Sequence, residues 1–311
     1  MKILVTGGAG YVGAVLTGLL LERGDRVRCY DRLANGAGPL LPFFRDPRFE
    51  LVRGDVRDAE SLGRSLRDVD AVCHLAAIVG YPACKRNPEA AQEVNVGGTR
   101  LLEAARARGQ SIVYACTGSV YGAVAEGVCT EETPARPLTV YGRTKLEAEK
   151  ILLDSGDAVS YRLATAFGLS PSLRLDVLVN DFCYQAARNH QLTVYGAEAR
   201  RTFIDVYDAA RAFLHALDNY EQMRGQIYNC GSERLNASKL DIVRMIQREM
   251  DLQVHFAQAG ADEDRRDYEV SYDKLAATGF RTLCTLEDGI RQMLTAFKYL
   301  PNPSQHIRPL E

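Results

Sequence analysis

The sequence predicts an α/β protein built on a Rossmann-type, doubly wound parallel sheet, with a smaller mixed α/β domain. Short apolar runs alternate with helical patterns through the first half of the chain. The apolar runs are continuous, as in strands that are covered on both faces. A glycine-rich turn directly follows the first run. The expected strands of this sheet are residues 2–6, 26–31, 49–54, 71–75, 112–115 and 158–163.

Helical patterns fill the stretches between these strands, because their apolar residues recur at a spacing of three and four. The expected helices of the first half are residues 10–23, 58–67, 87–108 and 140–153. The second half mixes helices with short strands, and it has no internal repeat. There we expect helices near 176–188, 206–219 and 239–250, and strands at 192–195, 226–230 and 253–256.

Composition and charge exclude several classes of function. The chain has 311 residues, of which 46% are hydrophobic and 25% charged, and its formal net charge of −2 gives no basic surplus for nucleic acid or an anionic membrane. No apolar run approaches the roughly 18 residues of a transmembrane helix, and the N-terminal strand is too short for a signal peptide. We therefore expect a cytoplasmic protein without a nucleic-acid or membrane partner.

Eight cysteines are scattered along the chain, none in a C-x-x-C pair and none near a histidine cluster. This pattern predicts reduced, buried thiols and no metal site.

The segment from Thr6 to Gly13, TGGAGYVG, follows the first strand and opens the first helix. Its glycines Gly7, Gly10 and Gly13 let the backbone approach a pyrophosphate, which the N–H groups at the helix start then bind. A glycine triplet alone is weak evidence, but its place in a βαβ unit strengthens it. The segment therefore predicts a dinucleotide site, with Tyr11 and Val12 beside the cofactor.

Asp31 ends the second strand, 18 residues after Gly13. A carboxylate there accepts hydrogen bonds from the adenosine ribose and repels a 2′-phosphate, which favours NAD. Arg32 is able to pair with a 2′-phosphate, and so NADP stays as the alternative. Further cofactor contacts are expected after the third and fourth strands, from Asp55 and Val56 at the adenine and from Leu75, Ala76 and Ala77.

Tyr141 and Lys145 form a Y-x-x-x-K pair, which places both side chains on one face of a helix. A neighbouring ammonium is expected to lower the pKa of the phenol, so that it exchanges a proton with a hydroxyl while a nicotinamide moves hydride. Thr117 lies just past the fifth strand, where open α/β sheets bind ligands, and its hydroxyl would polarise the reacting oxygen.

These segments together resemble the extended short-chain dehydrogenase/reductases, in particular their nucleotide-sugar epimerase/dehydratase family and its UDP-galactose 4-epimerase pattern. The resemblance covers nearly the whole chain. It is carried by TGGAGYVG, Asp31, Asp55-Val56, His74-Leu75-Ala76-Ala77, Asn95, the CTGSVYG loop and YGRTK.

The resemblance implies a role for each matching residue. Tyr141 would be the general acid/base, Lys145 its electrostatic partner and Thr117 the hydroxyl residue, while Asn35 and Asn95 would contact NAD. Asn180 would lie near the substrate diphosphate, and Arg201 and one of Arg265 and Arg266 would bind it, since an arginine fork matches phosphate geometry. Tyr81 and Ser119 would border the sugar.

The expected domains are interleaved. Residues 1–165 plus about 206–232 would form the NAD-binding Rossmann domain, about 166–205 plus 233–300 the nucleotide-sugar substrate domain, and 301–311 a tail. By resemblance, helices near 87–108 and 139–155 would form a homodimer interface, although their apolar residues also suit an intrachain core.

Departures from the family pattern favour epimerisation at C4 of a nucleotide-diphosphate sugar. Dehydratases of this type usually carry Asp-Glu after the active-site threonine, whereas Thr117 is followed by Gly118-Ser119. A ketosugar reductase or a sugar-nucleotide dehydrogenase is the alternative. A dehydratase, or a non-enzymatic regulator on the same fold, ranks below both.

Overall fold

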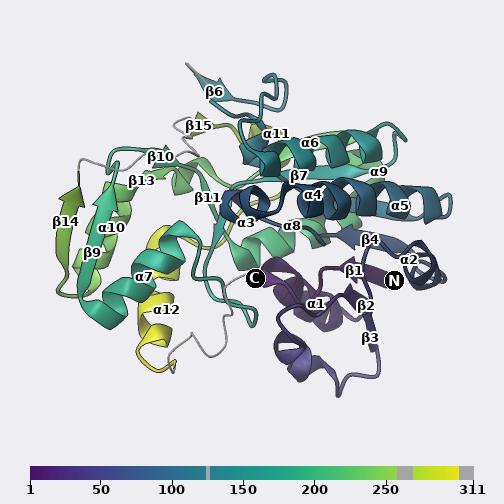
Figure 1. Ribbon diagram of the computed structural model, residues 1–311, viewed down its shortest axis with the longest axis horizontal. Helices are drawn as coiled ribbons and strands as arrows, with labels where there is room; N and C mark the ends of the chain where they lie inside the picture. The colour runs from purple at the N-terminus through teal and green to yellow at the C-terminus, as the bar shows by residue number, and fades with distance from the viewer. Residues whose placement is uncertain (124–126, 258–268, 301–311) are drawn as a thin grey trace.

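The computed structural model describes residues 1–123, 127–257 and 269–300. Its centre is a seven-stranded parallel sheet in the order β12-β7-β5-β4-β1-β2-β3 (Figure 1). The predicted Rossmann-type fold is therefore confirmed. The strands are β1 (Lys2–Thr6), β2 (Arg26–Asp31), β3 (Phe49–Arg53), β4 (Ala71–His74), β5 (Ser111–Thr117), β7 (Val159–Leu163) and β12 (Gln226–Cys230).

The strand order reverses between β1 and β4, and this reversal creates the binding edge of the sheet. The chain runs outward from β1 through β2 to β3 and then returns to β4 on the other side of β1. Thr6 and His74 are paired in register at the carboxyl ends of β1 and β4. The Oγ1 atom of Thr6 is hydrogen-bonded to Nδ1 of His74 at 2.7 Å. Ligands of open α/β sheets bind where the order reverses.

Helices cover the sheet in two groups. In one, α1 (Tyr11–Arg23) packs beside α8 (Val206–Asp218). In the other, α5 (Gly98–Ala105) packs between α2 (Ala59–Ser65) and α6 (Val140–Leu153). None of the helices in the described residues is both long enough and apolar enough to cross a membrane.

The continuous helix predicted over 87–108 is wrong in detail. The segment consists of α4 (Pro88–Gln92), one π-helical turn (Glu93–Gly97) and then α5. A separate short helix, α3 (Tyr81–Arg86), precedes it and lies outside the predicted helices. Asn87 divides the two helices, since its side chain accepts a hydrogen bond from the Ala90 backbone at 2.9 Å and caps α4.

A second, smaller core lies beside the sheet. It is built by α7 (Leu178–Asn189), α10 (Lys239–Glu249) and α12 (Leu286–Phe297), together with the parallel pair β9 (Gln191–Tyr195) and β14 (Gln253–Ala257). We call these elements the smaller unit and the sheet with its helices the larger unit (Figure 1). Phe167 and Phe203 meet edge-on in the smaller core, with ring centroids 6.4 Å apart.

Short strands connect the two units. Parallel β8 (Thr165–Phe167) and β11 (Phe203–Asp205) carry the chain from one unit to the other, and antiparallel β10 (Arg200–Arg201) and β13 (Ala237–Ser238) lie next to them. The remaining elements are η1 (Gly38–Phe43), η3 (Gly118–Val120), β6 (Val128–Cys129), α9 (Tyr220–Met223), η4 (Glu233–Leu235), β15 (Glu269–Val270) and α11 (Asp273–Ala277).

Candidate active site

The glycine turn after β1 is packed against the turn after β4. Gly7 has φ of +74°, and a Cβ there would lie 2.8 Å from the Ala76 nitrogen. A Cβ on Gly13 would lie 2.2 Å from the Gly7 oxygen, so both positions require glycine. Helix α1 begins after Gly10 without a side-chain cap. Its first N–H groups are therefore suited to an anion such as a pyrophosphate.

Asp31 lies at the end of β2 and reaches back to this turn. Its carboxylate accepts hydrogen bonds from the backbone of Ala9 at 3.0 Å and of Leu33 at 2.7 Å. Burial raises the pKa of Asp31, and these hydrogen bonds oppose the rise. Arg32 beside it is exposed. A carboxylate at this strand end fits the ribose of NAD, and so the turn and Asp31 together fit a dinucleotide.

The residues predicted near the adenine differ in their surroundings. Arg57 donates from Nε and Nη2 to the carboxylate of Asp55 at 3.0 and 2.8 Å, and this fork lowers the pKa of Asp55. Val56 is buried, and a Cβ on Gly98 would lie 2.6 Å from its Cγ2. Asn35 is exposed in the loop after β2.

Asn95, on the π-helical turn, is buried and holds the segment that leads into α3. Its amide oxygen accepts from the Ile78 nitrogen at 2.7 Å. Its amide nitrogen donates to the Ile78 oxygen and to the Thr144 hydroxyl, both at 3.0 Å. The side chain therefore ties the segment after β4 to α6, and the predicted contact of Asn95 with NAD stays a prediction.

Tyr141 stands in the first turn of α6, and Thr117 is the last residue of β5. The helix begins here because the Thr139 side chain accepts a hydrogen bond from the Gly142 backbone at 3.1 Å. The side chain of Thr117 interacts with the phenol of Tyr141 and opposes the rise in its pKa. Thr117 in turn donates to the hydroxyl of Ser119 at 3.2 Å. The structure thus brings together three residues that the sequence placed at the reacting sugar.

Lys145 is buried one helical turn after Tyr141, but its ammonium lies over the ring of Tyr114, with Nζ 4.2 Å from the ring centroid. Burial lowers the pKa of Lys145 to about 8. Burial also raises the pKa of Tyr141 to about 12, against the hydrogen bond with Thr117. The predicted lowering of the tyrosine pKa is therefore wrong for the protein alone, because desolvation of the phenol outweighs the favourable contacts.

Tyr11 and Asn180, both with predicted ligand contacts, are hydrogen-bonded to each other. Asn180 is completely buried, and its amide nitrogen donates to the Tyr11 hydroxyl at 3.1 Å. Its amide oxygen accepts from the Gly168 nitrogen at 3.0 Å, and Tyr11 donates to the Gly168 oxygen at 2.7 Å. Both side chains therefore hold the chain after β8, and the predicted place of Asn180 near a diphosphate stays a prediction.

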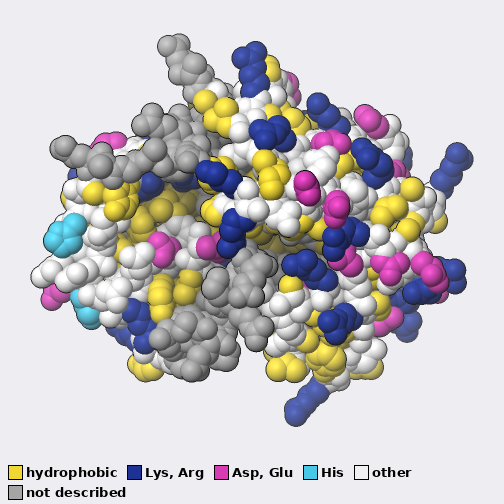
Figure 2. Space-filling view, viewed as in Figure 1, with side chains coloured by type: hydrophobic (Ala, Val, Ile, Leu, Met, Phe, Trp, Pro, Cys, Tyr) yellow, Lys and Arg dark blue, Asp and Glu magenta, His cyan; other side chains and the backbone are white. Residues whose placement is uncertain are grey.

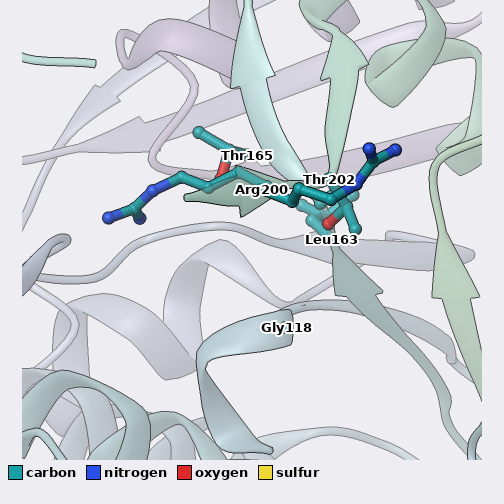
Figure 3. A pocket seen from close by; sticks show the side chains of 7 residues that line it. Gly118, Leu163, Thr165, Arg200 and Thr202 are labelled. Carbon is teal, nitrogen blue, oxygen red and sulfur yellow. The ribbon is translucent and has the colours of Figure 1, made fainter. Parts of the chain in front are cut away.

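A small pocket lies beside Gly118, at the start of η3 (Figure 3). Its lining residues are Gly118, Leu163, Ala164, Thr165, Arg200, Arg201 and Thr202. Arg200 and Arg201 are neighbours on β10, and neighbouring residues of a strand point to opposite faces. Arg201 and Gly118, the residue after Thr117, both line this pocket. Arg265 and Arg266 lie outside the described residues.

Tyr81 begins α3, where Nζ of Lys85 lies 5.3 Å from the centroid of its ring. Figure 2 shows a hollow between the smaller and the larger unit, with hydrophobic side chains inside and Lys and Arg side chains along its border. Basic borders of this kind favour an anionic ligand.

Arg174 is a charged residue near the candidate site that sequence reasoning missed. It precedes α7, and its positive charge opposes the rise in the pKa of both Tyr141 and Tyr11. Nothing in the local sequence marks it, since it lies 33 residues after Tyr141 in an irregular segment. The one local indication is Asp176, two residues later, whose carboxylate accepts a hydrogen bond from Nε of Arg174.

Comparisons with known proteins agree with this geometry. The model of the NAD dependent epimerase/dehydratase family matches residues 3–231. UDP-glucose 4-epimerase of Corynebacterium glutamicum is 31% identical over 253 residues, which are 75% of each chain. UDP-glucuronic acid decarboxylase 1 of Arabidopsis thaliana is 29% identical and covers 96% of this chain and 70% of its own.

Among solved structures, UDP-glucuronic acid 4-epimerase from Bacillus cereus, in complex with UDP-glucuronic acid and NAD, is similar to this chain with a TM-score of 0.86. It is 25% identical, and the match covers 96% of this chain and 99% of that one. With the glycine turn, Asp31 and the Tyr141–Thr117 pair in place, the chain belongs to the NAD-dependent epimerase/dehydratase family and uses NAD as its cofactor.

Proposed function

We propose that the protein is an NAD-dependent epimerase that inverts C4 of a nucleotide-diphosphate sugar. The observation that carries this proposal is the close packing of the start of α6, which carries Tyr141, against the loop that follows Thr117 at the carboxyl end of β5. A Cβ on Gly142 would lie 2.8 Å from the Ser119 oxygen. An acid/base with a neighbouring hydroxyl at that edge is suited to a secondary alcohol that becomes a ketone and returns. The relatives reported above, which act on UDP-glucose or UDP-glucuronic acid, support a nucleotide sugar as the substrate.

NAD, when bound, supplies reversible hydride transfer at the sugar carbon. Tyr141 removes the proton of the 4-hydroxyl, and Thr117 holds the same oxygen by a hydrogen bond. The buried ammonium of Lys145 supplies positive charge one helical turn away. The sugar ring then turns about its diphosphate and presents its opposite face to the cofactor. Tyr141 returns the proton to the same oxygen. The gain from such a positioned acid/base is about 10²- to 10⁴-fold in rate.

The residues after Thr117 favour epimerisation over loss of water. Elimination needs an acid and a base besides the tyrosine, and η3 contains Gly118, Ser119 and Val120, without a carboxylate. Net oxidation or reduction is the second candidate, because it needs the same three residues. It differs in consuming free NAD(H), which absorbance at 340 nm detects.

A test uses the purified protein with NAD and a panel of UDP-, GDP-, dTDP- and CDP-hexoses followed by NMR. We expect C4 interconversion of at least one sugar without net change at 340 nm, and tight retention of NAD. Tyr141→Phe should lose about 10³-fold in turnover while it keeps NAD. Tyr207→Phe is the matched control, because Tyr207 is 42% exposed on α8. Failure to interconvert any sugar of the panel would reject the proposal.

Several further properties belong to this proposal. We infer a homodimer in which α5 and α6 contribute the interface, a cytoplasmic location, and substrate binding by Arg201, Tyr81 and Ser119. The exposed polar pair between these helices, Arg100 with Glu147 at 3.3 Å, would lie at that interface. Sedimentation of the wild-type protein tests the oligomeric state.

A further inference from the structure

Tyr11 lies where the glycine turn of the larger unit meets the segment between β8 and α7, residues 168–177. It is the first residue of α1, so its N–H is one of the helix-start groups that have no partner within the helix and that suit a pyrophosphate. Tyr11 is only 7% exposed, and its hydroxyl contacts the segment after β8. This one residue therefore joins the expected cofactor turn to the chain that leads into the smaller unit.

Three hydrogen bonds connect Tyr11 to that chain. The Tyr11 hydroxyl donates to the Gly168 oxygen at 2.7 Å, and the Ser170 hydroxyl donates to the backbone oxygen of Tyr11 at the same distance. The amide nitrogen of Asn180, on α7, donates to the Tyr11 hydroxyl at 3.1 Å. Both the backbone and the side chain of Tyr11 are thus tied to the chain after β8.

The path of residues 168–177 depends on these contacts, because this fully described stretch contains no helix or strand. Gly168 has φ of +106°, and a Cβ there would lie 2.6 Å from Oδ2 of Asp205, so the position requires glycine. Asn180 accepts from the Gly168 nitrogen at 3.0 Å and donates to the Arg174 oxygen at 2.8 Å. A displacement of Tyr11 would therefore be passed to the backbone at both ends of the segment.

Such a connection makes the binding of two ligands cooperative. A ligand on the glycine turn restricts Tyr11, and a ligand between the two units needs the segment after β8 in place. Order that the first ligand has produced does not have to be produced again by the second. The family resemblance implies that Asn180 lies near the substrate diphosphate, and Asn180 is hydrogen-bonded to the hydroxyl of Tyr11.

We propose that Tyr11 is a positioning residue that couples the two ligands of the site. When NAD occupies the glycine turn, the start of α1 is fixed, and Tyr11 holds residues 168–177 in the path that receives the nucleoside diphosphate of the substrate. The sugar nucleotide therefore binds most tightly to protein that already holds NAD. This inference rests on the proposed nucleotide-sugar substrate and requires no chemistry at Tyr141.

Calorimetric titration with nucleoside diphosphates, which are not turned over, tests the proposal. UDP, GDP, dTDP and CDP are titrated into nucleotide-free and into NAD-loaded protein. The coupling is the ratio of the two dissociation constants of the ligand that binds most tightly. In wild type we expect NAD to strengthen its binding at least about fivefold. Tyr11→Phe keeps the ring and removes the hydroxyl, so its ratio should fall to about two or less. Because coupling is reciprocal, the affinity for NAD with and without the diphosphate should give the same ratio.

Ser170→Ala and Tyr207→Phe complete the set. Ser170→Ala removes the contact to the Tyr11 backbone, so its ratio should be intermediate, and it replaces Tyr11→Phe if that variant does not fold. The double variant of Tyr11 and Ser170 should have a ratio near one. Tyr207, 42% exposed on α8, is the control and should keep the wild-type ratio. Nucleotide-free Tyr11→Phe should bind the diphosphate about as tightly as nucleotide-free wild type does.

A merely structural role of Tyr11 would weaken binding equally with and without NAD and leave the ratio unchanged, which would overturn the proposal. A ratio of one in wild type, no measurable binding of any of the four diphosphates, or a ratio that survives in the double variant would overturn it as well.

The outcome is separable from that of the proposed function. Coupling that depends on Tyr11, together with no C4 interconversion by wild type, would reject the epimerase proposal and keep the role of Tyr11. Interconversion of a sugar nucleotide without such coupling would do the reverse.

Discussion

The larger and the smaller unit build their parts of the site in different ways. In the larger unit, Gly7, Asp31 and Thr117 stand at the carboxyl ends of β1, β2 and β5, so the sheet itself sets their positions. In the smaller unit, the segment that approaches the site has no regular structure. It is held by the side chains of Tyr11 and Asn180. A strand end positions a residue through the backbone, whereas this segment depends on a few buried polar side chains.

The two units also differ in the titratable groups that they bury. The larger unit buries Lys145 and His74, whose pKa values burial lowers to about 8 and about 3. At the junction with the smaller unit, burial raises the pKa of Asp205 to about 6. Active sites concentrate buried ionisable groups, whose charged forms cost free energy of folding. At these positions we expect substitutions that raise stability to lower function.

Among the buried titratable groups compared above, Lys145→Met should have the largest effect on function. Turnover is expected to fall by about 10²-fold or more, because the positive charge one helical turn after Tyr141 is lost. The free energy of unfolding at pH 7 should rise by about 1–3 kcal/mol, because a buried charge is replaced by an apolar chain of similar length. Denaturant unfolding and a turnover assay measure both quantities.

The pH dependence of the same variant gives a second check. The folded protein releases the Lys145 proton near pH 8, and the unfolded chain near 10.5. Between these values the unfolded chain binds more protons, so wild-type stability should gain a rising contribution with pH that Lys145→Met lacks. A methionine variant that is less stable than wild type at pH 7 would contradict the assignment of a buried charge.

Asn180→Leu should destabilise the protein by about 2–4 kcal/mol, because the Gly168 nitrogen and the Arg174 oxygen lose their buried partner. Tyr11→Phe, which removes one hydroxyl from the same network, should cost about 1 kcal/mol. Asn35→Leu is the control, since Asn35 is exposed. Unchanged stability in Asn180→Leu, with a loss of nucleotide-sugar affinity alone, would show that Asn180 contacts the ligand directly.

His74→Gln should have the smallest effect and alter the response to acid. Burial lowers the pKa of His74 to about 3, so between about pH 6.5 and 3 the unfolded chain takes up a proton that the folded protein refuses. In that window the free energy of unfolding decreases as the pH is lowered, by up to about 1.4 kcal/mol per pH unit. The variant should lose this dependence on pH. Urea unfolding at pH 7 and 5 measures it, with exposed His255→Gln as control. Equal slopes in all three proteins would contradict the buried neutral imidazole.

The sequence predicted those parts of the site that depend on local pattern. Gly13, Asp31 and Tyr141 were found because a turn, a strand end and a helical spacing each leave a mark in the chain. Six of the seven parallel strands followed from the same alternation of apolar runs, and the seventh, β12, was predicted as a strand of the second half.

The rest depends on tertiary contacts that no local pattern records. The position of Lys145 over Tyr114 requires β5 and α6 to be packed together. The structural role of Asn180 appears only once Gly168 and Tyr11 meet it. Arg174 was missed because its side chain reaches the region of Gly80 from an irregular segment, where Nη2 would lie 3.8 Å from a Cβ on that glycine.

The fate of a label at C4 tests the central claim, that Tyr141 exchanges the proton of a hydroxyl whose carbon is inverted. The holoprotein is incubated in H₂O with UDP-glucose and UDP-glucuronate carrying deuterium at C4, and NMR follows the products. We expect the C4 epimer with deuterium still on C4, and no product from Tyr141→Phe over the same period. Loss of the label to water, a dehydrated product, or wild-type turnover by Tyr141→Phe would contradict it.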